Sequence, residues 1–175
     1  MARSNLITVR RKPASSKSAG LLQLDSAIYP CILGRNGITS RKREGDWATP
    51  GGEFPVLGGF FRRDRLGFPA NRFGLNILKP TDGWCDEPSH PVYNRPIKLP
   101  FSASHEEMFR RDGLYDVVLV LDWNFSRRAR FRGSAIFIHL IDEKPYTAGC
   151  IAIDRKVMLK LLQLIKPQTR IRVLL

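Results

Sequence analysis

The sequence predicts a single mostly-β α+β domain, built as a β-sandwich or flattened barrel with one helix near its C-terminal end. Short apolar stretches alternate with turns rich in glycine, proline and asparagine, which is typical of eight or nine strands. Apolar residues recur at helical spacing over one convincing stretch, residues 155–166. A chain of 175 residues is also long enough to bury one hydrophobic core.

The strands are expected one after another along the chain, each ended by a turn. Proline and two glycines at residues 49–52 predict a tight reversal, after which Phe54 and Val56 alternate with other residues as a half-buried strand requires. The expected strands cover residues 6–9, 20–24, 27–33, 54–56, 74–78, 115–123, 135–138, 151–153 and 171–175. Residues 60–73 are expected to add an amphipathic strand pair with its arginines outward.

The helix and the long loops complete the prediction. Asp154 stands where it can cap a helix over residues 155–166, and Pro167 stops that helix. Residues 80–100 are rich in proline and are expected to form a long irregular loop. Residues 102–111 are expected to form a short helix with Ser104 as its N-cap.

Charge and composition divide the chain and suggest its partners. Residues 1–19 form a basic N-terminal segment, and residues 20–175 are expected to form the folded domain. The net charge of +13 indicates an anionic partner, such as nucleic acid, an acidic membrane surface or an anionic cell-wall polymer. Because residues 60–73 interleave arginine with phenylalanine, a basic nucleic-acid-binding β domain is the alternative from another functional class.

Three further patterns limit the possible functions. No apolar run is long enough to cross a membrane, and no apolar stretch of a secretory signal follows the basic N-terminus. The three cysteines and three histidines match no zinc-binding spacing, so no metal site is expected. If Cys150 is a working thiol, Cys31 and Cys85 are either two structural thiols or one disulfide.

The strongest chemical signal lies between residues 134 and 154. One apolar run delivers His139, a polar loop turns the chain, and Gly149 presents Cys150 before a second apolar run. Two neighbouring strands would bring this imidazole and this thiol together, as in a Cys–His nucleophile pair. A free thiol has a pKa of about 8.5, so it needs a base to act near neutrality. The alternative is a purely structural role, with an inert buried cysteine and an unrelated histidine.

The loop before the cysteine is a candidate oxyanion site. Gly149 has no side chain, so a substrate carbonyl can approach the backbone N–H groups beside it. Those N–H groups and the hydroxyl of Thr147 are the expected donors to a developing oxyanion.

A family resemblance makes the catalytic interpretation much more specific. His139 followed by Thr147-Ala148-Gly149-Cys150-Ile151 resembles the signature of the L,D-transpeptidase catalytic domain, the YkuD-like family. An upstream hairpin motif of the same family is similar to residues 49–54, and the resemblance covers roughly residues 20–175. A single-domain proteobacterial subgroup is similar also at Leu33-Gly34-Arg35, Trp84-Cys85-Asp86 and Tyr93-Asn94.

The resemblance implies a thiol acyltransferase of the cell wall. Cys150 would attack a peptidoglycan stem peptide between its third residue and D-Ala, and D-Ala would leave with a proton from His139. The carbonyl of Leu140 would orient the imidazole, an amine or water would resolve the thioester, and no metal or organic cofactor would be required. The expected partners are peptidoglycan stem peptides and anionic envelope polymers, and the protein itself is expected to be a monomer. The resemblance implies the periplasm or cell envelope, while the missing signal leaves a cytoplasmic location open.

Departures from the family pattern put the acceptor in question. Many members carry glycine where Leu140 stands, histidine where Ala148 stands and arginine where Ala152 stands. The same thiol could therefore transfer to an amine, or work as an L,D-carboxypeptidase or peptidoglycan hydrolase. The candidate substrate-binding residues elsewhere are Arg35, Arg95, Trp84 and Tyr93.

Overall fold

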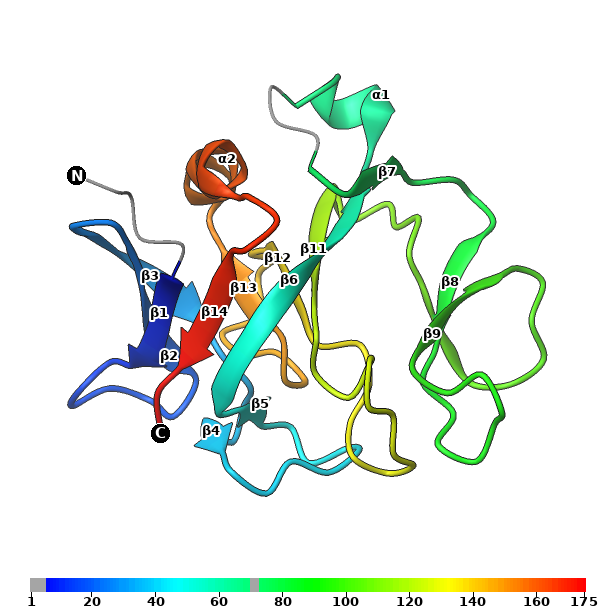
Figure 1. Ribbon diagram of the computed structural model, residues 1–175, viewed down its shortest axis with the longest axis horizontal. Coiled ribbons are helices and arrows are strands. Elements are labelled where there is room, and N and C mark those ends of the chain that lie inside the picture. Colours follow the sequence, from blue (N-terminus) through cyan, green and yellow to red (C-terminus); the bar gives the residue numbers. More distant parts are fainter. Residues whose placement is uncertain (1–5, 70–72) are drawn as a thin grey trace.

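A computed structural model describes residues 6–69 and 73–175 of the chain. Within these residues the fold is mostly β, with three sheets and two helices (Figure 1). The helices are α1 (Arg63–Leu66) and α2 (Arg155–Leu164). The strands are β1 (Leu6–Arg11), β2 (Ala19–Leu24), β3 (Ala27–Ile32), β4 (Ile38–Thr39), β5 (Thr49–Pro50), β6 (Gly52–Phe61), β7 (Leu75–Ile77), β8 (Asp82–Cys85), β9 (Arg95–Lys98), β10 (His105–Glu107), β11 (Val117–Leu121), β12 (Phe137–Leu140), β13 (Ile151–Ile153) and β14 (Arg170–Val173).

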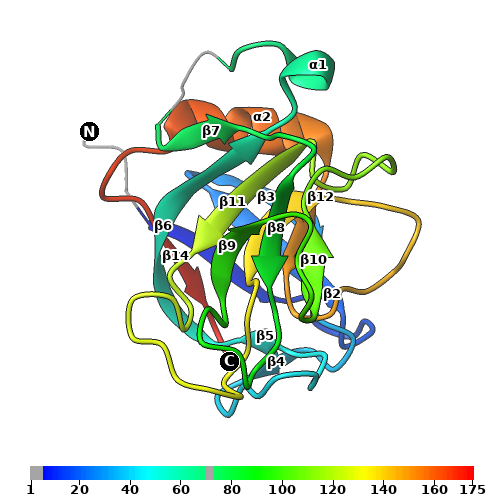
Figure 2. The same cartoon turned by 90° about the vertical axis from the view of Figure 1, so that its right-hand side faces the viewer.

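The large sheet has nine strands in the order β11-β12-β13-β3-β2-β1-β14-β6-β7. Strand β11 also pairs with β6 at the other end of this order, so the sheet closes on itself like a barrel. A smaller sheet, β10-β8-β9, lies in front of β11 and β12 in Figure 2. The predicted mostly-β fold with a flattened barrel and a C-terminal-side helix is therefore confirmed.

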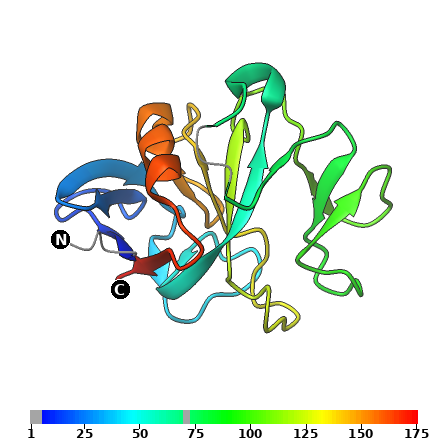
Figure 3. The ribbon, with the colours of Figure 1, turned by 45° about the horizontal axis from the view of Figure 1, so that its top comes forward.

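Strands β11, β12 and β13 of the large sheet are buried along their whole length. In β11 the side chains alternate: Val117, Leu119 and Leu121 belong to one core, and Val118 and Val120 belong to the other. Helix α2 covers the first core, and the β8–β10 sheet covers the second, so they lie on opposite sides of the large sheet (Figure 3). This double burial explains why β11 reads as an uninterrupted apolar run.

Helix α2 forms as expected at its start and ends slightly earlier than predicted. The Asp154 carboxylate accepts the backbone N–H of Lys156 at 2.7 Å, which caps the first turn. The helix ends at Leu164, and Ile165 is already extended. The prediction extended to residue 166, but a residue before Pro167 is disfavoured in the α conformation, so the helix stops short of it.

The segment from residue 80 to residue 107 corrects two predictions. The expected irregular loop contains the antiparallel pair β8–β9, and the expected helix at residues 102–111 contains strand β10 instead. The N–H of Met108 donates to Asp82 O, and Trp84 is buried at the centre of the second core. Pairing with distant strands satisfies this backbone, which local propensity does not reveal.

The basic segment at residues 60–73 also differs from its prediction. Strand β6 runs on to Phe61, and the single turn α1 follows it. Arg62 is buried rather than outward, because its guanidinium stacks on Phe109 and forms an ion pair with Asp64. Residues 70–72, which include Arg72 of this segment, lie outside the described residues.

The N-terminal region takes part in the large sheet. The short strand expected at residues 6–9 is present as β1, which pairs with β2 and with β14. Residues 1–5 of the basic segment lie outside the described part of the chain. The division into residues 1–19 and 20–175 stays a prediction.

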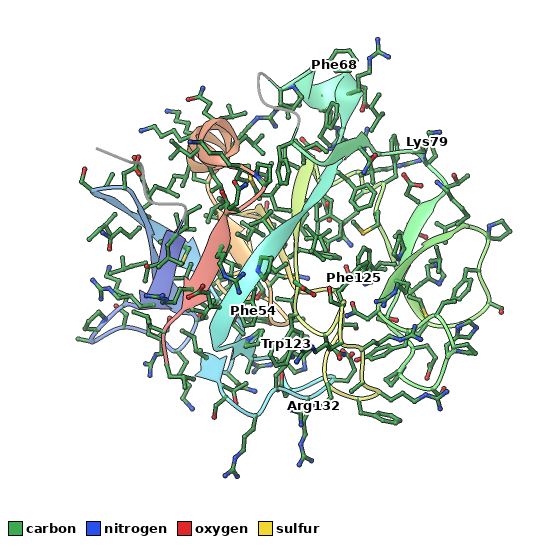
Figure 4. The ribbon with its side chains drawn as sticks, in the orientation of Figure 1. Phe54, Phe68, Lys79, Trp123, Phe125 and Arg132 are labelled. Carbon is green, nitrogen blue, oxygen red and sulfur yellow. The ribbon has the colours of Figure 1, made fainter. Side chains whose placement is uncertain are left out.

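The loop after β11 is held against the lower end of β6. Figure 4 shows Phe54, Trp123 and Arg132 close together there. The rings of Phe54 and Trp123 meet edge to face with centroids 5.6 Å apart, and the indole N–H of Trp123 donates to Arg132 O at 2.9 Å. These contacts support the loop that leads into β12.

The two described helices, α1 and α2, are short. Among the described residues, no helix is long and apolar enough to cross a bilayer.

Candidate active site

Two adjacent parallel strands place the candidate nucleophile and base. Strands β12 and β13 pair in register, with His139 opposite Ala152, and Cys150 immediately precedes β13. The N–H of Phe137 donates to Cys150 Sγ at 3.3 Å, and the thiol donates to Ala135 O at 3.0 Å. Residues 137 and 139 point to the same face of β12, so the imidazole shares the thiol's side of the sheet.

His139 and Cys150 line one pocket of about 460 Å³. One wall comes from β10 and the segment after it, and the other from the loop between β12 and β13, which Figure 2 shows beside β10. The remaining lining residues are Trp47, His105, Glu106, Glu107, Arg110, Leu114, Tyr115, Asp142, Lys144, Tyr146, Thr147 and Ala148.

The imidazole of His139 is held in one tautomer. Its Nδ1 lies 2.8 Å from Leu140 O, and because a carbonyl can only accept, Nδ1 carries the proton. The other nitrogen, Nε2, then has a free lone pair and can accept a proton. Burial lowers the pKa of His139 to about 4, so the ring is neutral at physiological pH. The ring also packs edge to face on Tyr115, with centroids 5.4 Å apart.

The thiol of Cys150 is protonated in the resting state. Burial, and after it the negative charge of the nearby Glu106 carboxylate, raise its pKa to about 12. The N–H of Phe137 and the ammonium of Lys42 act in the opposite direction. The site therefore holds a neutral thiol and a neutral imidazole rather than a thiolate–imidazolium pair, and any attack needs proton transfer as the new bond forms.

Gly149 is required by its surroundings and by its backbone shape. Its φ of +148° lies in the region that side chains rarely adopt. A Cβ added there would lie 2.9 Å from Ala48 O and 3.3 Å from Ile136 Cδ1. The backbone before Thr49 thus packs directly against the cysteine loop.

The two sequence motifs meet in space at this point. The Thr49 hydroxyl accepts the N–H of Gly34 at 2.8 Å, and the N–H of Thr147 donates to Leu33 O at 3.0 Å. Residues 33–35 therefore bridge the upstream hairpin motif to the loop that carries Cys150. The two motifs lie far apart in the chain, and in the folded protein each supplies one side of the same junction.

Thr147 closes the loop in front of Cys150. Its hydroxyl donates to Cys150 O at 2.7 Å and accepts the N–H of Gly149 at 3.1 Å. The hydroxyl proton is therefore engaged within the loop in this state. These bonds fix the backbone that presents the thiol.

The structure separates the four candidate substrate-binding residues. Arg35 is exposed near the pocket's rim, where its guanidinium lies 5.3 Å from the ring centroid of the pocket-lining Tyr146. Arg95 stacks on Phe125 at 4.2 Å. Trp84 and Tyr93 are buried in the fold, and these two and Arg95 are not among the residues described as lining the pocket.

Sequence reasoning missed three polar residues at the site. Glu106 and Tyr115 line the pocket, and the Tyr115 hydroxyl donates to the Glu106 carboxylate. Lys42 is 2% exposed, and its ammonium donates to Asp46 at 2.5 Å and lies next to Gly149. The wrong helix at residues 102–111 hid Glu106, and a lysine within a charged loop carries no local signal of burial.

The remaining cysteines stay apart from this chemistry. Cys31 and Cys85 are separate buried thiols, and burial raises the pKa of both. Within residues 6–69 and 73–175, no three His, Cys, Asp or Glu side chains form a group that could hold a metal ion.

Comparison with known proteins identifies a family model that covers most of the chain. The YkuD model, described as the L,D-transpeptidase catalytic domain, matches residues 21–173. No curated protein sequence matches.

Solved structures also resemble this chain. The helical cell shape determining protein Pgp2 from Campylobacter jejuni is 13% identical with a TM-score of 0.42, over 95% of this chain and 46% of that one. Bd1075 from Bdellovibrio bacteriovorus is 15% identical with a TM-score of 0.45, over 95% and 46%. L,D-transpeptidase 1 from Mycobacterium tuberculosis is 13% identical with a TM-score of 0.38, over 97% and 62%. The chain thus spans about half the length of the first two structures and under two thirds of the third.

Proposed function

The chain belongs to the YkuD family of L,D-transpeptidase catalytic domains, and from this premise we propose that it is a peptidoglycan-modifying cysteine acyltransferase. Its substrate is the tetrapeptide stem of peptidoglycan, and its nucleophile is Cys150. The enzyme releases the terminal D-Ala and transfers the remaining acyl group to an amine. Its action belongs to the cell envelope, where peptidoglycan lies.

The first half-reaction forms a thioester. The lone pair on His139 Nε2 takes the thiol proton as Cys150 Sγ attacks the carbonyl carbon before D-Ala. The imidazolium then gives that proton to the nitrogen of D-Ala, the C–N bond breaks, and the acyl group stays on sulfur. The Leu140 carbonyl holds Nδ1–H throughout, which stabilises the charged ring.

The loop around Gly149 supplies the proposed oxyanion site. The backbone N–H of Cys150 is the donor that we assign to the developing negative charge, because the N–H of Gly149 already donates to the Thr147 hydroxyl. Thr147 holds this loop in place, because its hydroxyl donates to Cys150 O and accepts the N–H of Gly149. Lys42 adds a buried positive charge close to the same loop.

One observation carries the proposal: Cys150 and His139 line the same pocket, and the contact of His139 Nδ1 with Leu140 O leaves Nε2 able to accept a proton. This arrangement suits general-base activation of a thiol, and the family assignment supplies the substrate class. The net charge of +13 favours accumulation of the enzyme on anionic envelope polymers.

Replacing the thiol tests the proposal directly. Wild-type protein incubated with a disaccharide tetrapeptide should release D-Ala, and a carbapenem should add covalently to Cys150, as followed by intact-mass spectrometry. Cys150→Ala should show neither reaction. Cys85→Ala, which removes another buried thiol outside the pocket, should keep both. A wild-type protein without any adduct, or an active Cys150→Ala variant, would contradict the proposal.

A second candidate function differs from the first in the fate of the acyl group. In it, the same thiol passes the acyl group to water instead of to an amine. The alanines at positions 148 and 152 motivate this L,D-carboxypeptidase or hydrolase reaction. Mass analysis of the products distinguishes the two: crosslinked dimers indicate transfer to an amine, and shortened monomers indicate hydrolysis.

A further inference from the structure

Glu106 is an acid built into the wall of the nucleophile's pocket. It lies on β10, which pairs antiparallel with β8 so that Glu106 stands opposite the buried Trp84. The hydroxyl of Tyr115 donates to its carboxylate. Tyr115 packs in turn on the ring of His139, so one chain of contacts links Glu106 to the candidate base.

This carboxylate works against the resting nucleophile. Its negative charge raises the pKa of the Cys150 thiol, and burial raises the pKa of Glu106 itself above its ordinary value. An ammonium group bound beside Glu106 would cancel that charge and remove the penalty on the thiolate. Arg110 lines the same pocket and acts to lower the pKa of Glu106, but its guanidinium is already paired with Asp112, so Glu106 is left to pair with a cationic guest.

The other acids of the pocket are less suited to this task. Glu107 is exposed on the opposite face of β10. Asp142 accepts the backbone N–H of Lys144 at 2.9 Å within its own loop. A carboxylate can accept about four hydrogen bonds, so the contact with Tyr115 fixes the orientation of Glu106 and still leaves capacity for an incoming donor.

We propose that Glu106 binds the ammonium group of the acceptor amine and takes its proton before the amine attacks the thioester. This inference rests on the proposed function and deepens it, because it names the group that selects an amine over water. The acceptor class is a stem peptide with a primary amine that is protonated in solution.

The step balances as follows. The ammonium gives one proton to Glu106 and becomes a free amine, which attacks the carbonyl carbon of the thioester. The C–N bond forms and the C–S bond breaks. His139 takes the second proton that the nitrogen loses and passes it to the departing Cys150 sulfur. Glu106 then releases its proton to solvent, and the enzyme returns to its resting state.

The test separates acylation from transfer. Glu106→Gln keeps the shape of the side chain and its contact with Tyr115 but removes the charge. With a disaccharide tetrapeptide as donor, its acylation rate, read by intact mass, should stay within about threefold of wild type. With a tripeptide stem bearing a free side-chain amine as acceptor, the ratio of amide product to hydrolysis product should fall roughly 10²-fold at pH 7.

The pH profile gives a readout that a purely structural defect would not. As pH rises towards the pKa of the acceptor amine, the amine loses its proton without help, so the variant's product ratio should recover towards the wild-type value. Glu143→Gln makes the same charge change on an exposed residue that is not among those described as lining the pocket, and it should keep the wild-type ratio at every pH. Glu106→Asp, which keeps a carboxylate, should retain part of the transfer even if Glu106→Gln folds poorly.

The outcomes distinguish the two proposals. A wild-type protein that never acylates contradicts the proposed function and the Glu106 assignment with it. Normal acylation in Glu106→Gln with an unchanged product ratio contradicts the Glu106 assignment alone. A wild-type protein that acylates and yields only hydrolysis products also contradicts the assignment, because no amine is then selected.

Discussion

At the scale of single residues, the site depends on burial more than on charge pairing. His139 is 4% exposed and Cys150 is 8% exposed, and burial moves their pKa values in opposite directions away from neutrality. Both groups are uncharged between these values. The sequence predicted the pair and its roles, while its resting protonation follows from a burial that motif spacing does not report.

His139 should make the fold sensitive to acid. Its pKa is near 6.5 in the unfolded chain and about 4 in the folded protein, so the unfolded state takes up a proton first as pH falls. Above pH 6.5 the histidine is neutral in both states and costs no stability. As pH falls from 6.5 towards 4, the free energy of unfolding should decrease progressively, by about 3 kcal/mol in total. Urea unfolding at several pH values should show this loss in wild type and a smaller loss in His139→Asn.

Carboxylates that titrate in the same range act in both proteins, so the difference between the two curves isolates the histidine. Curves for wild type and His139→Asn that stay parallel from pH 7 to pH 4 would show that the histidine is not the source.

Gly149 should tolerate no side chain. Alanine there combines a strained φ with a Cβ 2.9 Å from the Ala48 carbonyl, so Gly149→Ala should cost about 2–4 kcal/mol in unfolding free energy. Gly45 is the matched control, because its φ is +70° and nothing lies within 4 Å of its added Cβ. Gly45→Ala should cost only about 1 kcal/mol. Equal losses in the two variants would mean that the close contact with Ala48 contributes nothing.

At the scale of elements, the side-chain amide of the buried Asn94 joins the β8–β9 pair to the segment that leads into β12. Asn94 accepts the indole N–H of Trp84 and the N–H of Ala135 through one oxygen, at 2.9 and 3.0 Å. Ala135 O in turn accepts the thiol of Cys150. The small sheet therefore helps to position the Cys150 thiol, our proposed nucleophile, as well as covering the second core.

Removing that amide should loosen both the sheet and the thiol. Asn94→Ala leaves two buried donors without their acceptor, so it should lower the unfolding free energy by about 2–4 kcal/mol. The rate at which iodoacetamide modifies Cys150 should also change. Asn36→Ala, which removes an exposed amide with one bond to Asp46 O, should cost less than about 0.5 kcal/mol and leave thiol reactivity unchanged. Matching effects in both variants would contradict the role of Asn94.

The elements themselves were predictable to different degrees. The spacing of apolar residues and the capping residue Asp154 predicted helix α2. Turn residues at their ends predicted strands such as β2 and β3. Strand β10 was not predicted, because its sequence is short and polar, and only pairing with β8 makes it a strand. Arg62 was expected outside and is buried, since a nearby carboxylate and aromatic ring compensate its burial.

At the scale of the whole molecule, closure of the large sheet creates two cores with different uses. The core under α2 is built from apolar side chains such as Leu22, Ile153 and Leu161. The core under the β8–β10 sheet includes Cys150 and lies at the edge of the pocket. Strands β12 and β13, buried on both faces, thus place the proposed catalytic pair on one side of the sheet, while helix α2 packs on the other side.

The sequence by itself determined the β-rich class, the C-terminal helix and the pair formed by Cys150 and His139. These follow from local periodicity, capping and two short motifs, which are written in neighbouring residues. Only the tertiary structure decided that Glu106, Tyr115 and Lys42 join that pair, and that Arg95, Trp84 and Tyr93 do not line its pocket. Their places depend on which distant segments meet, and a contact between β10, β11 and the loop before β5 leaves no pattern in any one stretch of chain.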